Sequence, residues 1–221
     1  MTLTLDRDGA VLLPGAATGV LPEIEAALAE VPADRAGVRL HGLAALRGLL
    51  AATGAIGAIA TDALGPATQP VRALLFDKSA TTNWALGWHQ DRTIVVRERR
   101  EVDGFGPWTV KQGLQHVAPP FALLEAMVTL RVHIDPVPVD NAPLLVALGS
   151  HKRGRIPETA VEAVVADSRV HACIAERGDI WMYATPILHA SNAAVRPVRR
   201  RVLQIDFAAK PLPSGLEWLG V

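Results

Sequence analysis

The strongest constraint on the fold is a succession of short apolar segments that begins at residue 71 and runs almost to the end of the chain. Each segment is rich in Val, Ile and Leu and is bounded by Gly, Pro or polar residues, which is typical of β-strands. Strands are predicted over residues 71–76, 88–97, 128–135, 144–148, 170–175, 179–183, 187–190 and 202–208. Many short strands separated by turns predict a sandwich or a barrel.

Helical patterns are concentrated in the first seventy residues. Residues 22–30 begin with a proline at a first-turn position and carry apolar residues at helical spacing, residues 43–52 form a second helix, and residues 53–64 fit a short helix or a loop. Two more helices, over residues 121–127 and 157–166, interrupt the strands. We therefore expect one domain over residues 1–221, mainly β with flanking helices. Its helical flank is residues 1–70, and its β core is residues 71–210.

The charge balance excludes several classes of function. The chain has 22 basic and 22 acidic side chains, whereas a dedicated nucleic-acid or anionic-membrane binder needs an excess of basic residues. The apolar runs are too short for a membrane-spanning helix, and Asp6 and Asp8 near the start argue against a signal peptide. Cys173 is the single cysteine, so no internal disulfide can form. We expect a cytoplasmic protein without a nucleic-acid or membrane partner.

Two histidines and one aspartate form the pattern that carries chemistry. His89 and Asp91 are two residues apart, so on a strand both side chains point to the same face. His189 can add a third ligand from a neighbouring strand. Two histidines and one carboxylate on one face of an octahedral metal leave three positions open, an arrangement that suits Fe(II) with a bidentate cosubstrate and O2.

A second pair with the same spacing competes for this role. His133 and Asp135 also lie two apart on a predicted strand. In a double-stranded β-helix the His-x-Asp pair lies on the second strand and the distal histidine on the seventh, so four strands intervene. Four predicted strands separate Asp91 from His189, but only three separate Asp135 from His189. The count favours His89 and Asp91, and it leaves His133 as a strand histidine with a hydrogen-bonded or exposed ring.

A 2-oxoacid cosubstrate also needs a partner for its remote carboxylate, ideally a permanently charged and bidentate one. Arg200 begins the last predicted strand, eleven residues after His189. Ser191, two residues after His189, can share the face of that histidine and donate a hydroxyl. We interpret Arg196 and Arg199 as part of a solvated turn, and Arg201 as pointing away from the site.

Other residues near the metal motif are candidates for a substrate pocket, each with a structural alternative. Arg72 can meet an anionic substrate or 2-oxoglutarate, or form an ion pair. Lys78, Trp84 and Trp88 flank the motif, where the lysine can equally be a surface residue and the tryptophans can fill the core. His116 lies in a predicted loop of the kind that often covers a site, or is a surface histidine.

Several segments, in the right order, resemble the phytanoyl-CoA dioxygenase family of Fe(II)/2-oxoglutarate-dependent oxygenases. They are DRDGAVLLPGAAT (6–18), NWALGWHQD (83–91), DNAPLLVALGSHKRG (140–154), GDIWMYATPILHASN (178–192) and RRRVLQIDFA (199–208). The resemblance covers nearly the whole chain. The sequence departs from the family at Ala142, where Gly is usual, and at Leu148, where Pro is usual.

The resemblance implies a double-stranded β-helix, or jelly-roll, with Fe(II), 2-oxoglutarate and O2 as cofactor and cosubstrates. It implies His89, Asp91 and His189 as iron ligands and Arg200 with Ser191 at the far carboxylate. It also implies Trp108 near the cosubstrate.

The implied activity is oxidation of a small molecule, with release of succinate and CO2. Asp91 favours hydroxylation, because related halogenases lack this carboxylate. Two alternatives remain: a metal cupin independent of 2-oxoglutarate, and a non-catalytic jelly-roll binding module. The sequence leaves the substrate and the oligomeric state open.

Overall fold

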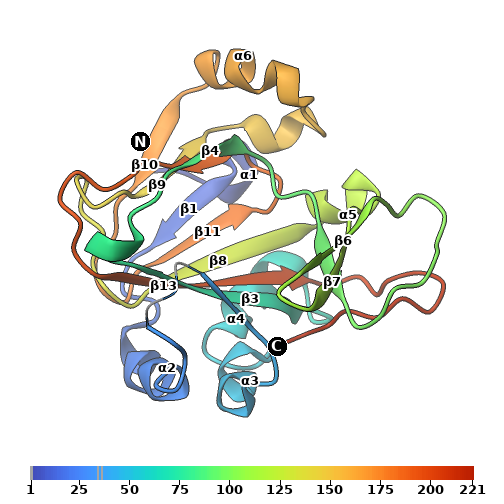
Figure 1. Cartoon of the computed structure of the whole chain (residues 1–221), viewed down its shortest axis with the longest axis horizontal. Coiled ribbons are helices and arrows are strands. Elements are labelled where there is room, and N and C mark those ends of the chain that lie inside the picture. Colours follow the sequence, from blue (N-terminus) through green and yellow to red (C-terminus); the bar gives the residue numbers. More distant parts are fainter. Residues whose placement is uncertain (1, 34, 36) are drawn as a thin grey trace.

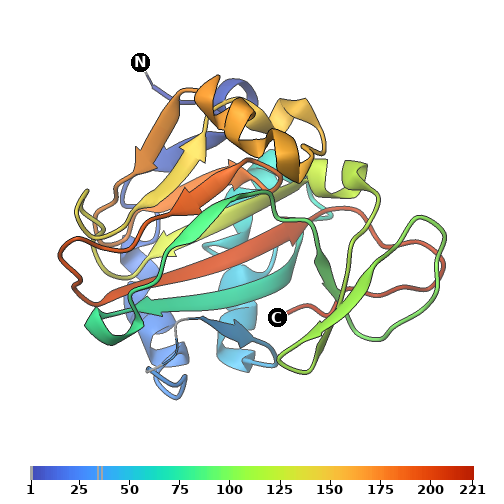
Figure 2. The same ribbon diagram turned by 45° about the horizontal axis from the view of Figure 1, so that its top comes forward.

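The computed structural model describes residues 2–33, 35 and 37–221. Two antiparallel sheets form the core and face one another, as Figures 1 and 2 show. The six-stranded sheet has the order β1-β11-β8-β13-β3-β2, and the four-stranded sheet has the order β10-β9-β12-β4. Their bounds are β1 Ala10–Leu13, β2 Val38–Leu40, β3 Gln69–Lys78, β4 Leu86–His89, β8 Met127–His133, β9 Leu144–Ala147, β10 Val170–Cys173, β11 Ile180–Ala184, β12 His189–Ser191 and β13 Arg200–Ala208.

A small third sheet, of order β5-β7-β6, lies beside the core at the right of Figure 1. Its strands are β5 Ile94–Val96, β6 Trp108–Lys111 and β7 Leu114–Val117. A separate apolar cluster that includes Val96, Val117 and Trp218 holds this sheet against the rest of the molecule. All three strands fall between β4 and β8 in the chain, so the small sheet is an excursion between two strands of the core.

Helices cover the outer face of the six-stranded sheet. The helices of the chain are α1 Leu5–Asp8, α2 Leu21–Ala27, α3 Ala44–Leu50, α4 Gly57–Leu64, α5 Phe121–Glu125 and α6 Val161–Ala166, with the 3-10 turns η1 Thr18–Val20, η2 Ala80–Thr82, η3 Ser150–Arg153 and η4 Glu158–Ala160. The helices that cover the sheet are α2, α3 and α4. Ile24 of α2, Leu46 of α3 and Ile56 just before α4 pack in one buried cluster with Leu130 of β8 and Leu203 of β13. None of the described helices combines the length and apolar character that crossing a membrane requires.

Alternation along the central strands separates an apolar face from a polar one. Leu130 of β8, and Leu203 and Ile205 of β13, turn toward the helices. Alternate side chains of a strand point to opposite faces, so Arg131 and Gln204 point into the space between the two sheets. Both are buried. The interior of this jelly-roll is therefore lined with polar groups on one wall, and these groups need partners there.

The mainly β architecture with flanking helices is confirmed, and all eight predicted strand segments contain strands. Three details differ from the expectation. Residues 1–70 also contain β1 and β2, which extend the six-stranded sheet at its two edges. Residues 88–97 contain the end of β4 and a separate strand, β5. The strands β6 and β7 form a hairpin in a segment expected to be a loop.

Candidate metal and cosubstrate site

The two histidines of the predicted triad lie opposite each other on neighbouring strands. His89, the last residue of β4, pairs with His189, the first residue of β12. Their ring centroids are 4.3 Å apart. In both rings Nδ1 is within hydrogen-bond distance of a backbone carbonyl two residues earlier in the chain, at 2.8 Å for Gly87 and 2.9 Å for Ile187. An Nδ1–H donor to these carbonyls leaves both Nε2 atoms free to bind a metal.

Asp91 completes the triad, although it lies just beyond the end of β4. The prediction placed both residues of the pair on one strand, but β4 ends at His89. Gln90 between them turns the other way and is buried, where its amide donates to the carbonyls of Gly154 and Pro186 at 3.0 and 2.8 Å. Its Oε1 accepts from the Ile156 amide at 2.9 Å. These three hydrogen bonds hold the Gln90 side chain in place, so that its neighbours His89 and Asp91 both face the candidate metal site.

The donor set fits a divalent transition metal. His89, Asp91 and His189 each offer a ligand atom, and these atoms lie within 4.8 Å of one another. Burial lowers the pKa of His189 to about 4, so its ring is neutral and its lone pair available near neutral pH. Burial would raise the pKa of Asp91, but the neighbouring Arg72, His189 and His89 hold it below its ordinary value. Two imidazoles and one carboxylate match the ligand set of non-haem Fe(II) sites.

Arg72 links Asp91, a candidate metal ligand, to a buried carboxylate. From β3, its Nη2 donates to Asp91 Oδ2 at 3.0 Å, and its Nε donates to Asp206 Oδ2 on β13. The other oxygen of Asp206 accepts from the Thr129 hydroxyl at 3.0 Å. Arg72 was a candidate for the substrate pocket with an ion pair as the alternative. Here it forms that ion pair and also lines the cavity described next.

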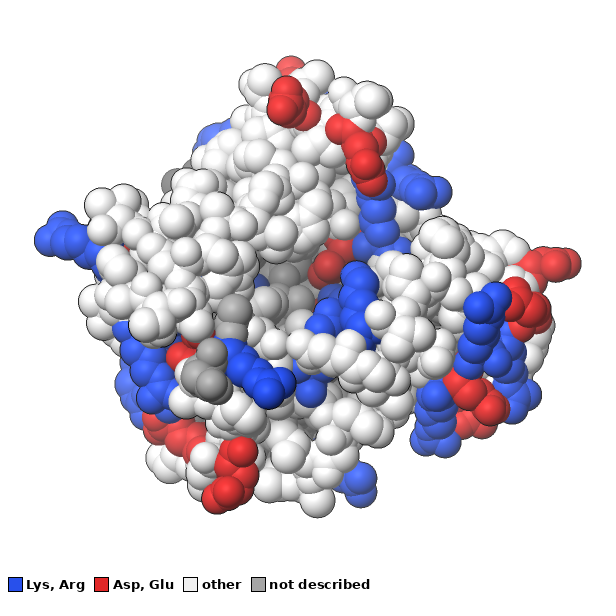
Figure 3. All heavy atoms as spheres, in the orientation of Figure 1, with Lys and Arg blue, Asp and Glu red and all other residues white. Residues whose placement is uncertain are grey.

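A cavity of about 140 Å³ connects the triad to the basic interior of the jelly-roll. The residues that line it are Arg72, Leu74, Phe76, Lys78, Trp84, Leu86, His89, Asp91, Arg131, Leu144, His189, Ala190, Ser191, Arg200 and Gln204. Figure 3 shows a hollow near the centre of the molecule with basic and acidic groups around it. The cavity thus brings together the three predicted metal ligands and the two predicted cosubstrate residues, Arg200 and Ser191.

Arg200 is only 3% exposed and has no carboxylate partner among the described residues. Its Nη1 donates to the backbone carbonyls of Asn141 and Ala142, and its Nε has no partner there. Burial, and then the nearby Arg131, lower the pKa of Arg200. A buried guanidinium without a counter-charge is costly, so this end of the cavity favours an anion.

Lys78 lies at the same end, paired with Arg200 across β3 and β13. Its ammonium donates to the Trp84 carbonyl at 2.7 Å and to Ser191 Oγ at 3.2 Å, and it lies 4.1 Å from the centre of the Trp84 ring. Burial, followed by Arg200 and Arg131, lowers the pKa of Lys78 to about 8. Lys78 and Trp84 are thus cavity residues, and the lysine is not on the surface.

The remaining aromatic and histidine candidates lie elsewhere. Trp88 points to the other face of β4, where it packs against a cluster that includes Val161 of α6. Trp108 belongs to the small third sheet, with the Arg99 guanidinium 5.5 Å from its ring centre. His116 is in β7 of that sheet and is buried rather than on the surface. The structure does not place these three candidates among the residues that line the cavity.

The contacts of Asp135 exclude the competing pair, His133 and Asp135, from the candidate metal site. Its carboxylate accepts from the Arg201 side chain at 2.8 and 2.9 Å, outside the cavity. His133 is 2% exposed, and neither ring nitrogen has a hydrogen-bond partner among the described residues. The expectation of an exposed or hydrogen-bonded ring was wrong, because the ring faces the interior of the jelly-roll, next to Arg131 and Arg200.

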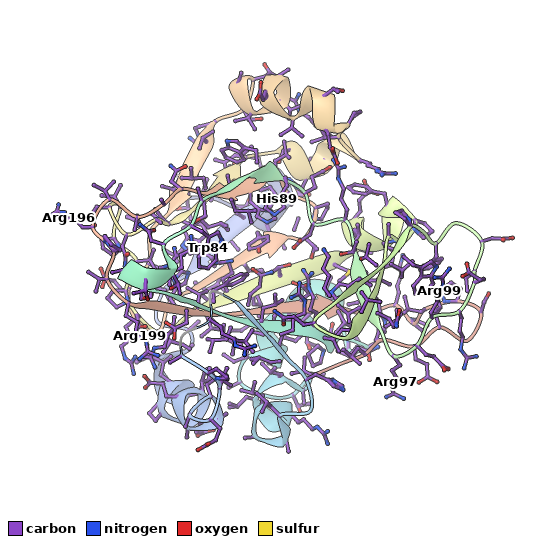
Figure 4. All side chains as sticks on the ribbon, in the orientation of Figure 1. Trp84, His89, Arg97, Arg99, Arg196 and Arg199 are labelled. Atoms are coloured by element: carbon purple, nitrogen blue, oxygen red, sulfur yellow. The ribbon has the colours of Figure 1, made fainter. Side chains whose placement is uncertain are left out.

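The labelled arginines in Figure 4 lie away from the site. Arg196 and Arg199 project at the left edge, and Arg97 and Arg99 lie near the small sheet on the right, whereas Trp84 and His89 lie over the centre. Arg196 pairs with Asp140, and Arg199 pairs with Asp77. The interpretation of Arg196 and Arg199 as turn residues outside the site agrees with these positions.

Three cavity or support residues were missed in the sequence: Arg131, Gln204 and Asp206. Each is a polar residue inside an otherwise apolar strand, in TLRVH and VLQID. A polar residue at every second position of a buried strand is a usable signal of a polar interior wall. It does not reveal which opposite residue each group meets, because that depends on the register of β8 against β13.

A jelly-roll that presents two histidines and a carboxylate beside a buried arginine defines the class of 2-oxoglutarate-dependent non-haem iron enzymes. The sequence bears this out: the model of the phytanoyl-CoA dioxygenase (PhyH) family matches residues 5–202. The chain belongs to this family. The fold, the enzyme class and the cofactors Fe(II) and 2-oxoglutarate predicted from the motifs are thereby confirmed. A search of curated proteins gave no significant match.

Solved structures of low sequence identity share the fold. EctD from S. alaskensis with bound Fe is 17% identical, with a TM-score of 0.65 over 92% of this chain and 74% of that chain. HygX from Streptomyces hygroscopicus with nickel and 2-oxoglutarate bound is 14% identical, with a TM-score of 0.59 over 92% and 84%. The epimerase SnoN from nogalamycin biosynthesis, an alpha-ketoglutarate-dependent non-heme enzyme, is 18% identical, with a TM-score of 0.61 over 92% and 77%.

Proposed function

We propose that this protein oxidises a small molecule, by hydroxylation or a related reaction, with Fe(II), O2 and 2-oxoglutarate. The observation that carries the proposal is the shared cavity, in which the triad and the uncompensated Arg200 face the same space. The balanced reaction converts substrate C–H, O2 and 2-oxoglutarate into the alcohol, succinate and CO2. Iron, when bound, supplies the activation of O2 that links these two oxidations.

The residues of the chain have separate tasks in this proposal. His89, Asp91 and His189 hold the metal on one face. Arg200 binds the far carboxylate of 2-oxoglutarate, and the Ser191 hydroxyl, which the Lys78 ammonium contacts, assists. Removal of bulk water strengthens these interactions, and the burial of His189 and Arg200 is consistent with such a dry site.

The size of the cavity supports a small substrate that binds at its mouth. A volume of about 140 Å³ is below the roughly 300 Å³ at which pockets for drug-sized ligands begin. It suits the cosubstrate, so the substrate is expected on the open side, where Leu86 is 48% exposed. Among the structural relatives, EctD has been solved with 5-hydroxyectoine and HygX with hygromycin B. Asp91 favours hydroxylation here, although SnoN is an epimerase.

The remaining expectations belong to the same proposal. We infer a cytoplasmic enzyme without a nucleic-acid or membrane partner, supported by balanced charge and by a single buried cysteine, Cys173. A single domain with a helical flank over residues 1–70 and a β core over residues 71–210 also remains a proposal. Trp88 remains a candidate on the substrate side, because it lines a more open pocket together with His89, whereas Trp108 and His116 line neither that pocket nor the cavity of the triad.

Succinate formation tests the proposal without knowledge of the substrate. The protein is incubated with Fe(II), ascorbate, O2 and 2-oxoglutarate, because such enzymes turn over slowly without substrate. Wild type should form succinate, and His189→Ala should not. Equal succinate from both would overturn the proposal. Substrate oxidation that proceeds without 2-oxoglutarate and is unchanged in Arg200→Ala would instead favour the 2-oxoglutarate-independent cupin.

A further inference from the structure

On the wall of the cavity formed by β8 and β13, residues that pair across the two strands lie side by side, and each such pair is here called a row. Thr129 is opposite Asp206, Arg131 is opposite Gln204, and His133 is opposite Val202. The Asp206 row reaches the metal ligand Asp91 through Arg72. Arg200 lies at the other end of the wall, four residues before Gln204 on the same strand. Arg131 therefore lies between the metal end and the Arg200 end of one cavity.

A short path also connects Arg131 with the distal metal ligand. Its Nη1 donates to Gln204 Oε1 at 2.7 Å, and the Tyr183 hydroxyl donates to the same oxygen at 3.3 Å. The Tyr183 ring centroid is 5.9 Å from that of His189. The neutral amide of Gln204 thus fixes the guanidinium on the metal side of the wall without neutralising its charge.

Arg131 has no carboxylate partner among the described residues. It is 7% exposed, its Nε is unpartnered, and its guanidinium carbon lies 5.2 Å from the centre of the Phe76 ring. Arg72, by contrast, contacts two carboxylates. The cavity therefore holds two buried guanidiniums, Arg131 and Arg200, that lack a counter-charge. Such groups call for two negative charges from a ligand.

We propose that Arg131 is a further cosubstrate-binding residue, which receives the carboxylate next to the keto group of 2-oxoglutarate while Arg200 receives the far one. One dicarboxylate then satisfies both guanidiniums. The assignment of ends follows from position, because Arg131 is on the side of His189 and Asp206. This inference rests on the proposed function, since it takes 2-oxoglutarate as the ligand of the cavity.

Two probes separate the two ends of the ligand. 2-Oxoglutarate carries both carboxylates, whereas 2-oxobutyrate carries only the one next to the keto group. Each is titrated anaerobically into the Fe(II)-loaded protein, and its dissociation constant is taken from the visible absorption of the chelate. Arg131→Gln should weaken both probes by a similar factor, roughly 10- to 100-fold. Arg200→Gln should weaken 2-oxoglutarate by a comparable factor and leave 2-oxobutyrate unchanged.

Controls separate a contact from a folding defect. Arg199→Gln removes the neighbouring arginine, which pairs with Asp77 outside the cavity, and should leave both dissociation constants unchanged. Arg131→Lys retains the charge and should recover part of the loss for both probes. Binding of Mn(II) without an oxoacid should be the same in Arg131→Gln and wild type. A loss of Mn(II) binding would assign Arg131 a structural role and overturn the proposal.

Two further outcomes would contradict it. A loss in Arg131→Gln for 2-oxoglutarate alone would place Arg131 at the far carboxylate. No loss for either probe would exclude it from cosubstrate binding. Failure of the wild type to bind either probe would overturn the proposed function itself, which distinguishes that failure from the other two.

Discussion

At the scale of single residues, Asp206 holds Arg72 against Asp91, a candidate metal ligand. It is 2% exposed and holds the guanidinium that contacts Asp91. Asp206→Asn leaves Arg72 with Asp91 as its one carboxylate partner, so the arginine competes with the metal for that carboxylate. We expect Fe(II) affinity to fall by about 10- to 100-fold, as for other residues that orient metal ligands. Competition with a chromogenic chelator measures this.

Thr129→Val is the graded control for this prediction. It removes one hydrogen bond to Asp206 and leaves both carboxylates and Arg72 in place. Its effect on Fe(II) affinity should be smaller than that of Asp206→Asn. Unchanged Fe(II) affinity in a folded Asp206→Asn protein would show that the network does not position the ligand.

Lys78 predicts a pH dependence of cosubstrate binding. Its pKa is lowered to about 8 by burial and by the charges of Arg200 on β13 and Arg131 on β8, and the Ser191 hydroxyl and Trp84 complete its surroundings. Below pH 8 the ammonium is charged and attracts a carboxylate, and above pH 8 the neutral amine does not. Affinity for 2-oxoglutarate should therefore fall as pH rises from 7 to 9, by up to about tenfold per pH unit above the pKa.

The control removes the titrating group. Lys78→Met should bind 2-oxoglutarate more weakly at pH 7, with an affinity that varies little up to pH 9. Calorimetric titration at several pH values measures both proteins. A decline of the same steepness in Lys78→Met would assign the dependence to another group.

At the scale of elements, alanine substitutions at two glycines of the helical flank should change the free energy of unfolding in opposite directions. A Cβ at Gly57, at the start of α4, would lie 1.9 Å from the backbone oxygen of Ala51. Since backbone must shift, Gly57→Ala should lower the free energy of unfolding by about 1–3 kcal/mol. Gly48 is exposed within α3, with no atom near its Cβ position, so Gly48→Ala should raise it by about 0.5–1 kcal/mol. Urea denaturation distinguishes them, and similar values for both would refute the packing of α3 on α4.

Elements with a strong local pattern could be predicted, and elements that depend on pairing could not. The buried strands β8 and β13 are identifiable from their apolar runs. Strand β1 is four residues long and exists through its pairing with β11 at the edge of the sheet. The hairpin of β6 and β7 turns at Gln112 and Gly113, both with positive φ, which matches a tight turn. That dipeptide was the available signal, but the polar strands around it resembled a loop.

In the candidate site too, residues with a local sequence pattern could be predicted, and residues whose role depends on strand pairing could not. The three residues that meet in the structure could be named from the sequence, because His89 and Asp91 are close together in it and strand counting favours them over the other His-x-Asp pair. Arg131 and Asp206 could not be assigned, because their roles depend on which residues meet across β8, β13 and β3. Trp108, expected near the cosubstrate from the family resemblance, is in the small third sheet and does not line the cavity.

At the scale of the whole molecule, strand counting succeeds because the small sheet stands apart. Seven strands follow β4 before β12, yet three of them, β5 to β7, form their own sheet. The other four, β8 to β11, are those that the count requires between the His-x-Asp pair and the distal histidine. The jelly-roll thus tolerates an insertion beside its core without displacing His89 from His189.

The measurement that tests the central claim most directly is an anaerobic titration of Fe(II) and 2-oxoglutarate, followed by visible absorption. Wild-type protein should develop the weak chelate band, with one iron and one 2-oxoglutarate bound per chain. His89→Ala should not. Absence of the band in wild type, or its persistence unchanged in His89→Ala, would contradict the assignment of His89, Asp91 and His189 as the iron site.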